Sequence, residues 1–308
     1  MRQMRPMRWA QGARGRGAVA LVVMVVATVV AVRQRAVVAE GVDRLAAADR
    51  GWLLVAGTSA VLTWGCSALA LQGAVRETLP AGRLLAGQFA ASAANHVLPS
   101  GLGAGAVNVR LLQRCGLSLP RAASALAVKT GAGGAVRGAL LAVLAVSCPG
   151  VLRMPESVPW LPLAGVCVAG AATVPFRGRL RGAAARVLAD VRDVHQLPNR
   201  AAALWGGSLA FALLHATVLI ALTRSLDVAL PAQQVALAYL AASSAAVLLP
   251  TPGNLGSLDA ALLFALVAAG APGSAAGAAV IGYRLFTAWL PLVPGLAVLV
   301  VLVRRRIV

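Results

Sequence analysis

Asp259 is the single carboxylate within an apolar segment of the sequence, and three cationic side chains lie in similar surroundings. A carboxylate inside a bilayer has to be paired, protonated or hydrated. The candidate partners are Arg284, in "GYRLFTAWLP", and Lys129 and Arg137, in "VKTGAGGAVRGAL". Lys129 and Arg137 are eight residues apart and fall roughly on one helical face. These residues suit ion pairing or the passage of a charged group, and Arg284 is the most testable partner of Asp259.

Three other polar residues, Asn95, His96 and Arg110, flank a Pro/Gly cluster. We expect them to line a polar pathway together with the charged residues. A structural alternative exists for several of these residues. Arg110 would extend to the inner membrane interface, His96 would be an ordinary hydrogen-bonded histidine, and Asp259 would only lock the helices together through an ion pair.

The composition indicates an integral membrane protein. Of the 308 residues, 59% are hydrophobic and 12% are charged, and the mean hydropathy is +0.82. Soluble domains carry about 25% charged residues. The apolar runs are long and rich in Ala, Leu, Val and Gly, without the alternation that spanning β-strands show. We therefore predict an all-α polytopic membrane protein.

The formal net charge of +19 does not indicate nucleic-acid binding, because the Arg residues lie in short stretches between apolar runs and lack interleaved aromatics. Anionic membrane lipids are the expected electrostatic partners. The four cysteines form no CxxC pair, and the sequence contains no hydrolase, nucleotide-binding or zinc motif. We therefore expect no cofactor, no bound metal and no enzymatic activity.

Apolar runs long enough to cross about 30 Å of hydrocarbon predict about six full spans. Two further apolar regions, 84–115 and 231–270, are interrupted by Pro/Gly clusters, and we predict broken hairpins that return to the side from which they enter. We expect the first run to be a retained helix; the alternative is a cleaved signal peptide. The six runs are 17–32, 51–72, 122–146, 158–175, 201–222 and 274–303.

The distribution of Arg residues predicts the orientation in the membrane. With the N-terminus in the cytoplasm, most of the Arg residues outside the spans fall on the cytoplasmic side. Cytoplasmic loops carry such an excess of positive charge. We therefore predict a multi-pass protein of the plasma membrane with cytoplasmic N- and C-termini.

The two interrupted regions resemble each other. Residues 97–112 read "VLPSGLGAGAVNVRLL" and residues 248–263 read "LLPTPGNLGSLDAALL". The predicted orientation makes the two units opposite, which indicates an inverted-topology repeat with re-entrant or broken hairpins at corresponding positions. Breaks inside a membrane are tolerated where protein or a wet cavity satisfies the backbone; the alternative is a pair of ordinary turns outside it. The predicted helix-break residues are Pro99, Gly101, Gly103, Pro250, Pro252, Gly253 and Gly256.

The repeat divides the chain into five parts. They are a basic cytoplasmic N-terminus at 1–16, a first helix and outer loop at 17–50, repeat unit 1 at 51–147 with its break near 99–105, a connecting helix and basic cytoplasmic loop at 148–200, and repeat unit 2 at 201–308 with its break near 250–256.

The pattern "LLPTPGNLGSLDAAL" followed by "GYRLFTAWLPLVPG" resembles the C-terminal signature of the lysylphosphatidylglycerol synthase transmembrane-region family, and "LPSGLGAGAVNVRLLQRCG" is similar to its N-terminal signature. The resemblance implies a helical bundle that, in the best-known members, moves a modified phospholipid between leaflets. Those members also carry a soluble aminoacyl-transferase domain, for which this sequence holds no segment of sufficient length and polarity. Two features differ: Asp259 stands where Glu is more usual, and the first break lacks the Gly-Asp/Glu that often precedes its Arg.

Two functions follow as hypotheses. The first is a lipid flippase or transporter that moves an anionic or modified (glyco)phospholipid, or a polyprenyl-linked lipid, between leaflets through a cavity between the two broken hairpins. The alternative is a non-transporting membrane scaffold, or a partner subunit of a separately encoded lipid-modifying transferase.

Overall fold

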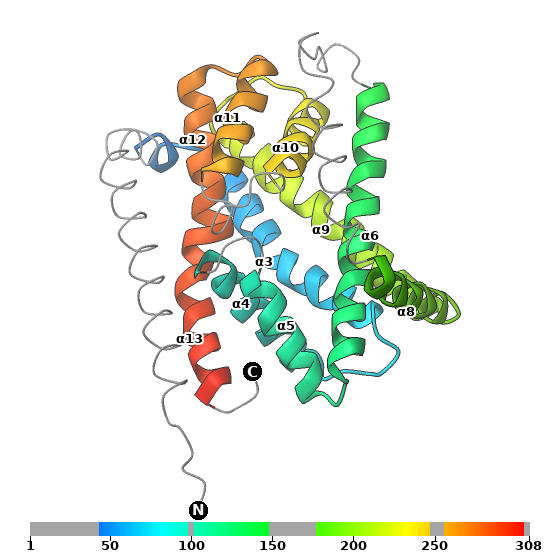
Figure 1. The fold of residues 1–308 in the computed structure, drawn as a ribbon. Coiled ribbons are helices and arrows are strands. Elements are labelled where there is room, and N and C mark those ends of the chain that lie inside the picture. Colours follow the sequence, from blue (N-terminus) through cyan, green and yellow to red (C-terminus); the bar gives the residue numbers. More distant parts are fainter. Residues whose placement is uncertain (1–42, 98–101, 148–176, 247–255, 305–308) are drawn as a thin grey trace, which may run out of the picture.

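The computed structural model describes residues 43–97, 102–147, 177–246 and 256–304, and in these ranges the regular secondary structure is entirely helical (Figure 1). The runs 17–32 and 158–175 lie outside the described residues, as do Pro99, Gly101, Pro250, Pro252 and Gly253. The helices are α3 (Arg50–Gly73), α4 (Ala81–Val97), α5 (Leu102–Arg114), α6 (Leu119–Ser147), α8 (Arg177–His195), α9 (Pro198–Ser225), α10 (Ala232–Ala246), α11 (Ser257–Ala268), α12 (Gly273–Arg284), the π-helix η2 (Leu285–Trp289) and α13 (Leu290–Arg304).

Within the described ranges, four helical segments are long and apolar enough to cross a membrane. They are α3, α6, α9 and the continuous segment Gly273–Leu302, which joins α12, η2 and most of α13. The four corresponding predicted runs are thereby confirmed as long apolar helices. A helix needs about 20 residues to cross the hydrocarbon core, and the shortest of the four has 24. Large apolar side chains on their outer faces, such as Val146 and Val293, are exposed and suit contact with lipid tails.

The first helices of the two units, α3 and α9, pack closely and run antiparallel. The backbone N–H of Asp49, which precedes α3, donates to the carbonyl of Ser225 at the end of α9 (3.1 Å). At the opposite end, Gly73 and Gly207 bring the two backbones together. A Cβ atom at Gly207 would lie 2.7 Å from the backbone N of Ala70. Glycine is therefore required at this crossing.

The remaining helices of the two units exchange contacts reciprocally. α4 packs against α5 within the first unit, and α10 packs against α11 within the second. Across the units, α4 packs against α13, and α10 packs against α6. Each hairpin thus contacts the last helix of the other unit, and Figure 1 shows α13 and α6 on opposite sides of the bundle. With α3 and α9 antiparallel, this arrangement is compatible with an inverted repeat; the repeat itself and the side of the membrane on which each unit begins stay predictions.

Two of the glycines predicted to break the helices lie in the described ranges, and they differ. Gly256 has a φ of +81° and directly precedes α11, a conformation that favours glycine. Gly103, by contrast, lies in the first turn of α5 and not in the break. Its lack of a side chain serves packing, because a Cβ atom there would lie 2.0 Å from the carbonyl oxygen of Ala94 on α4.

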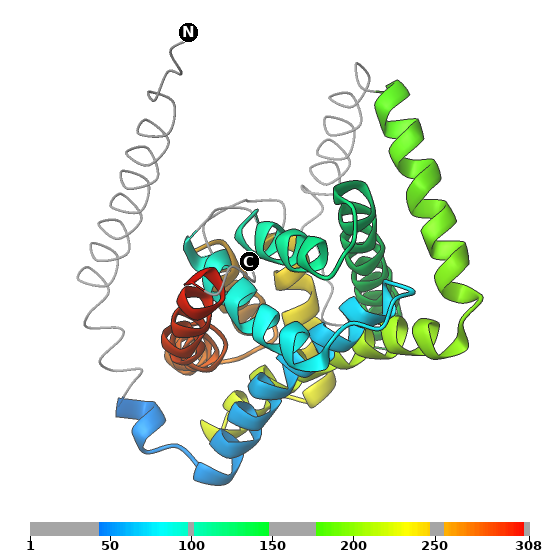
Figure 2. The ribbon, with the colours of Figure 1, turned by 90° about the horizontal axis from the view of Figure 1, so that it is seen from below.

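The basic helix α8 lies at the edge of the bundle, where it packs against α6 and the start of α9 (Figure 2). The indole N–H of Trp205 on α9 donates to Nε2 of His195 at the end of α8 (2.9 Å). Arg200 donates to the carbonyl of Arg76 (3.1 Å) and to the hydroxyl of Thr78 (3.0 Å) in the loop between α3 and α4. These bonds join the connecting segment to both units at one end of the bundle.

The helix crossing gives a first prediction. Gly207→Ala should lower the thermal midpoint of the detergent-solubilised protein by several degrees, because the new methyl group meets backbone atoms of α3 that cannot rotate away. Gly206→Ala is the matched control, since a Cβ atom there meets nothing within 4 Å; it should be neutral or stabilising by about 0.5–1 kcal/mol. Equal midpoints for the two variants would contradict the close crossing.

The orientation gives a second prediction. In a cysteine-free background, Arg224→Cys should react with a membrane-impermeant thiol reagent added to intact cells, because this exposed residue at the end of α9 is predicted to lie outside. Ser118→Cys, also exposed, is predicted to lie inside and should react only after permeabilisation. The reverse labelling pattern would invert the predicted topology.

Candidate functional site

A polar cavity of about 220 Å³ lies inside the helix bundle. Its wall combines all four helices of the first unit, α3 to α6, with α9 and η2 of the second. The cavity was predicted to lie between the two broken hairpins. The first hairpin, α4 and α5, does line it, but no described residue of the second hairpin, α10 and α11, does so. The lining residues are Ala60, Thr63, Trp64, Ser67, Gln88, Ala91, Ser92, Asn95, Ala104, Asn108, Lys129, Phe211, His215 and Thr287.

Lys129 on α6 organises the polar side chains of this cavity. Its Nζ atom donates to the hydroxyl of Ser67 on α3 (2.8 Å) and to Oε1 of Gln88 on α4 (3.3 Å). The Ser67 hydroxyl in turn donates to the same Gln88 oxygen (2.8 Å). Gln88 Nε2 donates to Oδ1 of Asn108 on α5 (2.9 Å), and Asn108 Nδ2 donates to the carbonyl of Ala104 (2.9 Å). One chain of hydrogen bonds therefore connects all four helices of the first unit.

The ammonium group fixes the direction of every bond in this chain. An ammonium has three donors and no acceptor, so the atom of Gln88 that faces Lys129 has to be the oxygen. The amide nitrogen of Gln88 then faces Asn108 and requires its oxygen, which leaves the Asn108 nitrogen for the carbonyl of Ala104. Gln88 and Asn108 are 4% and 5% exposed. Buried amides of this kind need partners, and the network supplies them.

Two hydrogen-bonding positions in the cavity are open within the described ranges. Lys129 has three N–H bonds and finds two acceptors, Ser67 and Gln88. The buried Oδ1 atom of Asn95 has no hydrogen-bond partner. A ligand that offers both an acceptor and a donor would satisfy both positions.

Ser67 and Lys129 are close enough to be compared with a catalytic serine and its base. A general base has to accept the hydroxyl proton. Here the hydroxyl of Ser67 donates to Gln88, and the ammonium of Lys129 donates to Ser67. Neither contact removes the Ser67 proton, so the arrangement is that of a lysine ammonium held by hydrogen bonds to neutral side chains.

The predicted pathway residues separate into groups. Lys129 and Asn95 line the cavity. His96 lies next to it and its Nδ1 contacts the carbonyl of Ser92 (2.8 Å), as in the structural alternative. Arg110 is exposed on α5 and does not line the cavity, which favours its alternative role at the interface. Arg137 is partly exposed on α6 and also stands outside the lining.

Sequence reasoning found Asn95 but missed the other neutral polar residues of the cavity. Gln88, Ser92 and Asn95 stand four and three residues apart on α4, and Thr63 and Ser67 stand four apart on α3. Such spacing places each set on one helical face. A search for polar stripes within the apolar helices would have found them.

Asp259 forms the predicted ion pair with Arg284. Arg284 Nε donates to Oδ1 of Asp259, and the side chains are 7% and 31% exposed. The other carboxylate oxygen accepts from the backbone N–H of Gly256 (2.8 Å), one turn earlier at the start of α11. An acidic residue at this position stabilises the N-terminus of a helix. The pair therefore joins α11 to the end of α12, and its part in a lipid pathway stays a prediction.

A cluster of aromatic rings connects this ion pair with the cavity. The hydroxyl of Tyr283, next to Arg284, contacts Nδ1 of the cavity residue His215 (2.9 Å). The ring of Tyr239 on α10 stacks on His215 with a centroid distance of 5.9 Å. Thr287, three residues beyond Arg284, lines the cavity from η2. The ion pair and the cavity are thus neighbouring but separate sites.

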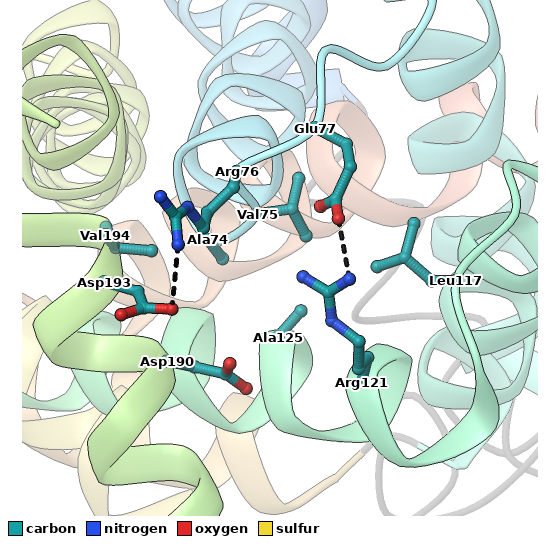
Figure 3. Close-up of a pocket in the computed structure, with 10 residues that line it drawn as sticks. All are labelled: Ala74, Val75, Arg76, Glu77, Leu117, Arg121, Ala125, Asp190, Asp193 and Val194. Atoms are coloured by element: carbon teal, nitrogen blue, oxygen red, sulfur yellow. Dashed lines mark hydrogen bonds and ion pairs between the residues drawn. The ribbon is translucent and has the colours of Figure 1, made fainter.

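A second, smaller pocket lies at the end of the bundle where α8 packs (Figure 3). Arg76 pairs with Asp193 of α8 (3.2 Å), and Arg121 pairs with Glu77 (2.8 Å). Figure 3 shows Asp190 near these groups on the same face of α8. The paired side chains are about half exposed, and such pairs contribute about 0–1 kcal/mol each. These weak ion pairs connect the α3–α4 loop with α6 and α8 at the surface.

The fold and the cavity define a class: a helical, polytopic membrane protein with a partly open polar site lined by helices of two units. A sequence model of the family described as Lysylphosphatidylglycerol synthase TM region matches residues 17–295. The chain belongs to this family, which confirms the resemblance, and it is a membrane protein related to lipid handling. A comparison with curated proteins found no match.

The buried ion pair gives a third prediction. Asp259→Asn removes the negative charge beside the buried guanidinium of Arg284. Breaking a fully buried pair costs about 3–5 kcal/mol, and the partial exposure of Asp259 reduces the expected loss to about 2 kcal/mol. Thermal unfolding in detergent should show a midpoint several degrees lower.

Asp193→Asn is the matched control, because it removes a carboxylate from an ion pair whose side chains are 50% and 42% exposed. It should cost less than about 1 kcal/mol. If both substitutions shift the midpoint equally, the Asp259–Arg284 pair is not the stabilising contact that its burial indicates.

Proposed function

We propose that the protein moves a lipid between the leaflets of the membrane, with the polar headgroup passing through the cavity around Lys129. The observation that carries the proposal is this partly open polar cavity of about 220 Å³ between the helices. Polar side chains inside a membrane protein are costly, and they mark pathways for polar or charged substrates.

The size of the cavity supports a headgroup as its occupant. Pockets for complete drug-sized ligands measure about 300–1,000 Å³, so this cavity fits a headgroup and leaves the acyl chains outside. The apolar outer faces of the spans suit those chains, since Leu54, Val61 and Val146 are exposed. Headgroup and tails would thus travel in different surroundings, as they do in the bilayer.

The family, the transmembrane region of lysylphosphatidylglycerol synthases, supports a role in lipid handling. We place the protein in the plasma membrane with both termini in the cytoplasm, on the basis of the Arg distribution. The proposed protein partner is a separately encoded lipid-modifying transferase.

Filling the cavity gives a fourth prediction. Ala104→Phe places a ring beside Asn108 and should reduce the protein-dependent transbilayer exchange of acyl-labelled phospholipid in proteoliposomes by about tenfold, because the headgroup loses its space. Exchange is measured as the fraction of label protected from a membrane-impermeant quencher over time. Ala106→Phe, at an exposed position on the same helix, should keep the rate of the unsubstituted protein.

Both variants need thermal midpoints close to that of the unsubstituted protein, so that a lost rate reports the cavity and not the fold. Exchange by the unsubstituted protein no faster than in protein-free vesicles, across anionic, zwitterionic and cationic lipids, would reject transport. It would favour the scaffold or partner subunit instead.

A further inference from the structure

The cavity carries an uncompensated positive charge. Among the described residues that line it, Lys129 carries the one formal charge, and none is a carboxylate. Its hydrogen-bond partners, Ser67 and Gln88, are neutral. Asp259 does not help, because its two oxygens bind Arg284 and the N–H of Gly256. A largely buried cation without a counter-charge is costly, so an anion is the occupant that this wall favours.

Lys129 is also the only lysine in a sequence that otherwise carries its positive charge on arginine. An arginine presents five donors in a rigid planar fork, whereas a lysine is a compact point charge with three donors. Two of these donors reach the side-chain network, and the third is open within the described ranges. A single open donor on a point charge suits one oxygen of a phosphate group.

The unsatisfied oxygen of Asn95 adds a second requirement. This oxygen accepts hydrogen bonds, so its partner has to be a donor such as a hydroxyl. Asn95 and Lys129 line the same cavity from α4 and α6. A phosphate that carries a hydroxylated substituent, such as glycerol or a sugar, supplies an acceptor for Lys129 and a donor for Asn95.

We propose that the cavity selects lipids whose headgroup is a phosphodiester with net negative charge and free hydroxyls, and that Lys129 is the residue that determines this selectivity. The inference rests on the proposed function. A headgroup with a net positive charge, such as an aminoacylated phosphatidylglycerol, would bring its ammonium groups towards Lys129 without a carboxylate to receive them. A zwitterionic choline headgroup lacks the hydroxyls for Asn95.

The experiment compares three acyl-labelled lipids in proteoliposomes. They are phosphatidylglycerol, phosphatidylcholine and lysyl-phosphatidylglycerol, whose headgroups carry net negative, zero and net positive charge. We expect phosphatidylglycerol to exchange about tenfold faster than the other two. Lys129→Gln should reduce its rate by about tenfold and leave the phosphatidylcholine rate within about twofold, because the choline ammonium already offsets the phosphate charge that attracts Lys129 in phosphatidylglycerol.

Two further variants separate selectivity from stability. Lys129→Arg keeps the positive charge and should keep the preference for phosphatidylglycerol, even at a lower rate. Arg114→Gln removes a positive charge from an exposed position at the end of α5 and should leave all three rates unchanged. If Lys129→Gln does not fold, the same question is put to the unsubstituted protein by labelling its single lysine with an amine reagent. Phosphatidylglycerol should then slow the labelling of Lys129, and phosphatidylcholine should not.

A soluble phosphate could occupy the same site in place of a lipid headgroup. Glycerol 3-phosphate, added in the lumen and outside, distinguishes the two sources. Slower lysine labelling with the lipid and not with glycerol 3-phosphate supports the lipid assignment, and protection by glycerol 3-phosphate alone overturns it.

The outcomes distinguish this inference from the proposed function. If the unsubstituted protein exchanges lipids but shows no preference for phosphatidylglycerol, or prefers lysyl-phosphatidylglycerol, the inferred selectivity is wrong and transport stands. If Lys129→Gln slows all three lipids equally, Lys129 does not determine selectivity. If the protein exchanges none of the three lipids, the proposed transport function is wrong and the selectivity inference falls with it.

Discussion

The close antiparallel crossing of α3 and α9 is the contact on which the other arrangements depend. Gly73 and Gly207 let the two backbones approach to a distance that any side chain would prevent. The crossing also orients the helix faces beyond it. The carbonyl of Cys66 lies near Gly207, and the next residue, Ser67, lines the cavity. On α9, Phe211 and His215 follow Gly207 by one and two turns and form the facing wall.

The bilayer imposes the same requirement on two charged sites, and the structure meets it in two ways. Arg284 receives a carboxylate from Asp259, and the carboxylate is itself held at a helix N-terminus. Lys129 receives only neutral oxygen atoms from the described side chains around it. The first site is electrically complete and suits a structural role. The second site gives the Lys129 ammonium hydrogen-bond partners but no opposite charge, which is the property expected of a binding site for an anionic group.

The features that could be predicted from the sequence are those with a large free-energy cost in the membrane. The four long spans and the Asp259–Arg284 pair follow from length, hydropathy and the cost of an isolated carboxylate. Gln88 and Asn108 were not predicted, because a neutral amide in an apolar helix does not stand out in the sequence as a charge does. A buried amide nevertheless also needs hydrogen-bond partners. The pattern predicts a break at Gly103, because the sequence does not distinguish a glycine that ends a helix from one that lets two helices touch. The cavity likewise depends on which helices become neighbours across the two units.

The π-helix at 285–289 sets the phase of the final membrane segment. The N–H of Leu290 bonds to the carbonyl of Leu285, five residues back, so this turn holds one residue more than an α-helical turn. Each residue rotates a helix by about 100°. The insertion allows Tyr283 to face His215 while Gly295, further along, lies against the Phe89 carbonyl of α4. Deleting a single residue here would rotate α13 relative to α12, and the two contacts could then no longer form together. The extra residue therefore sets the rotation of α13 that lets this segment contact both α9 and α4.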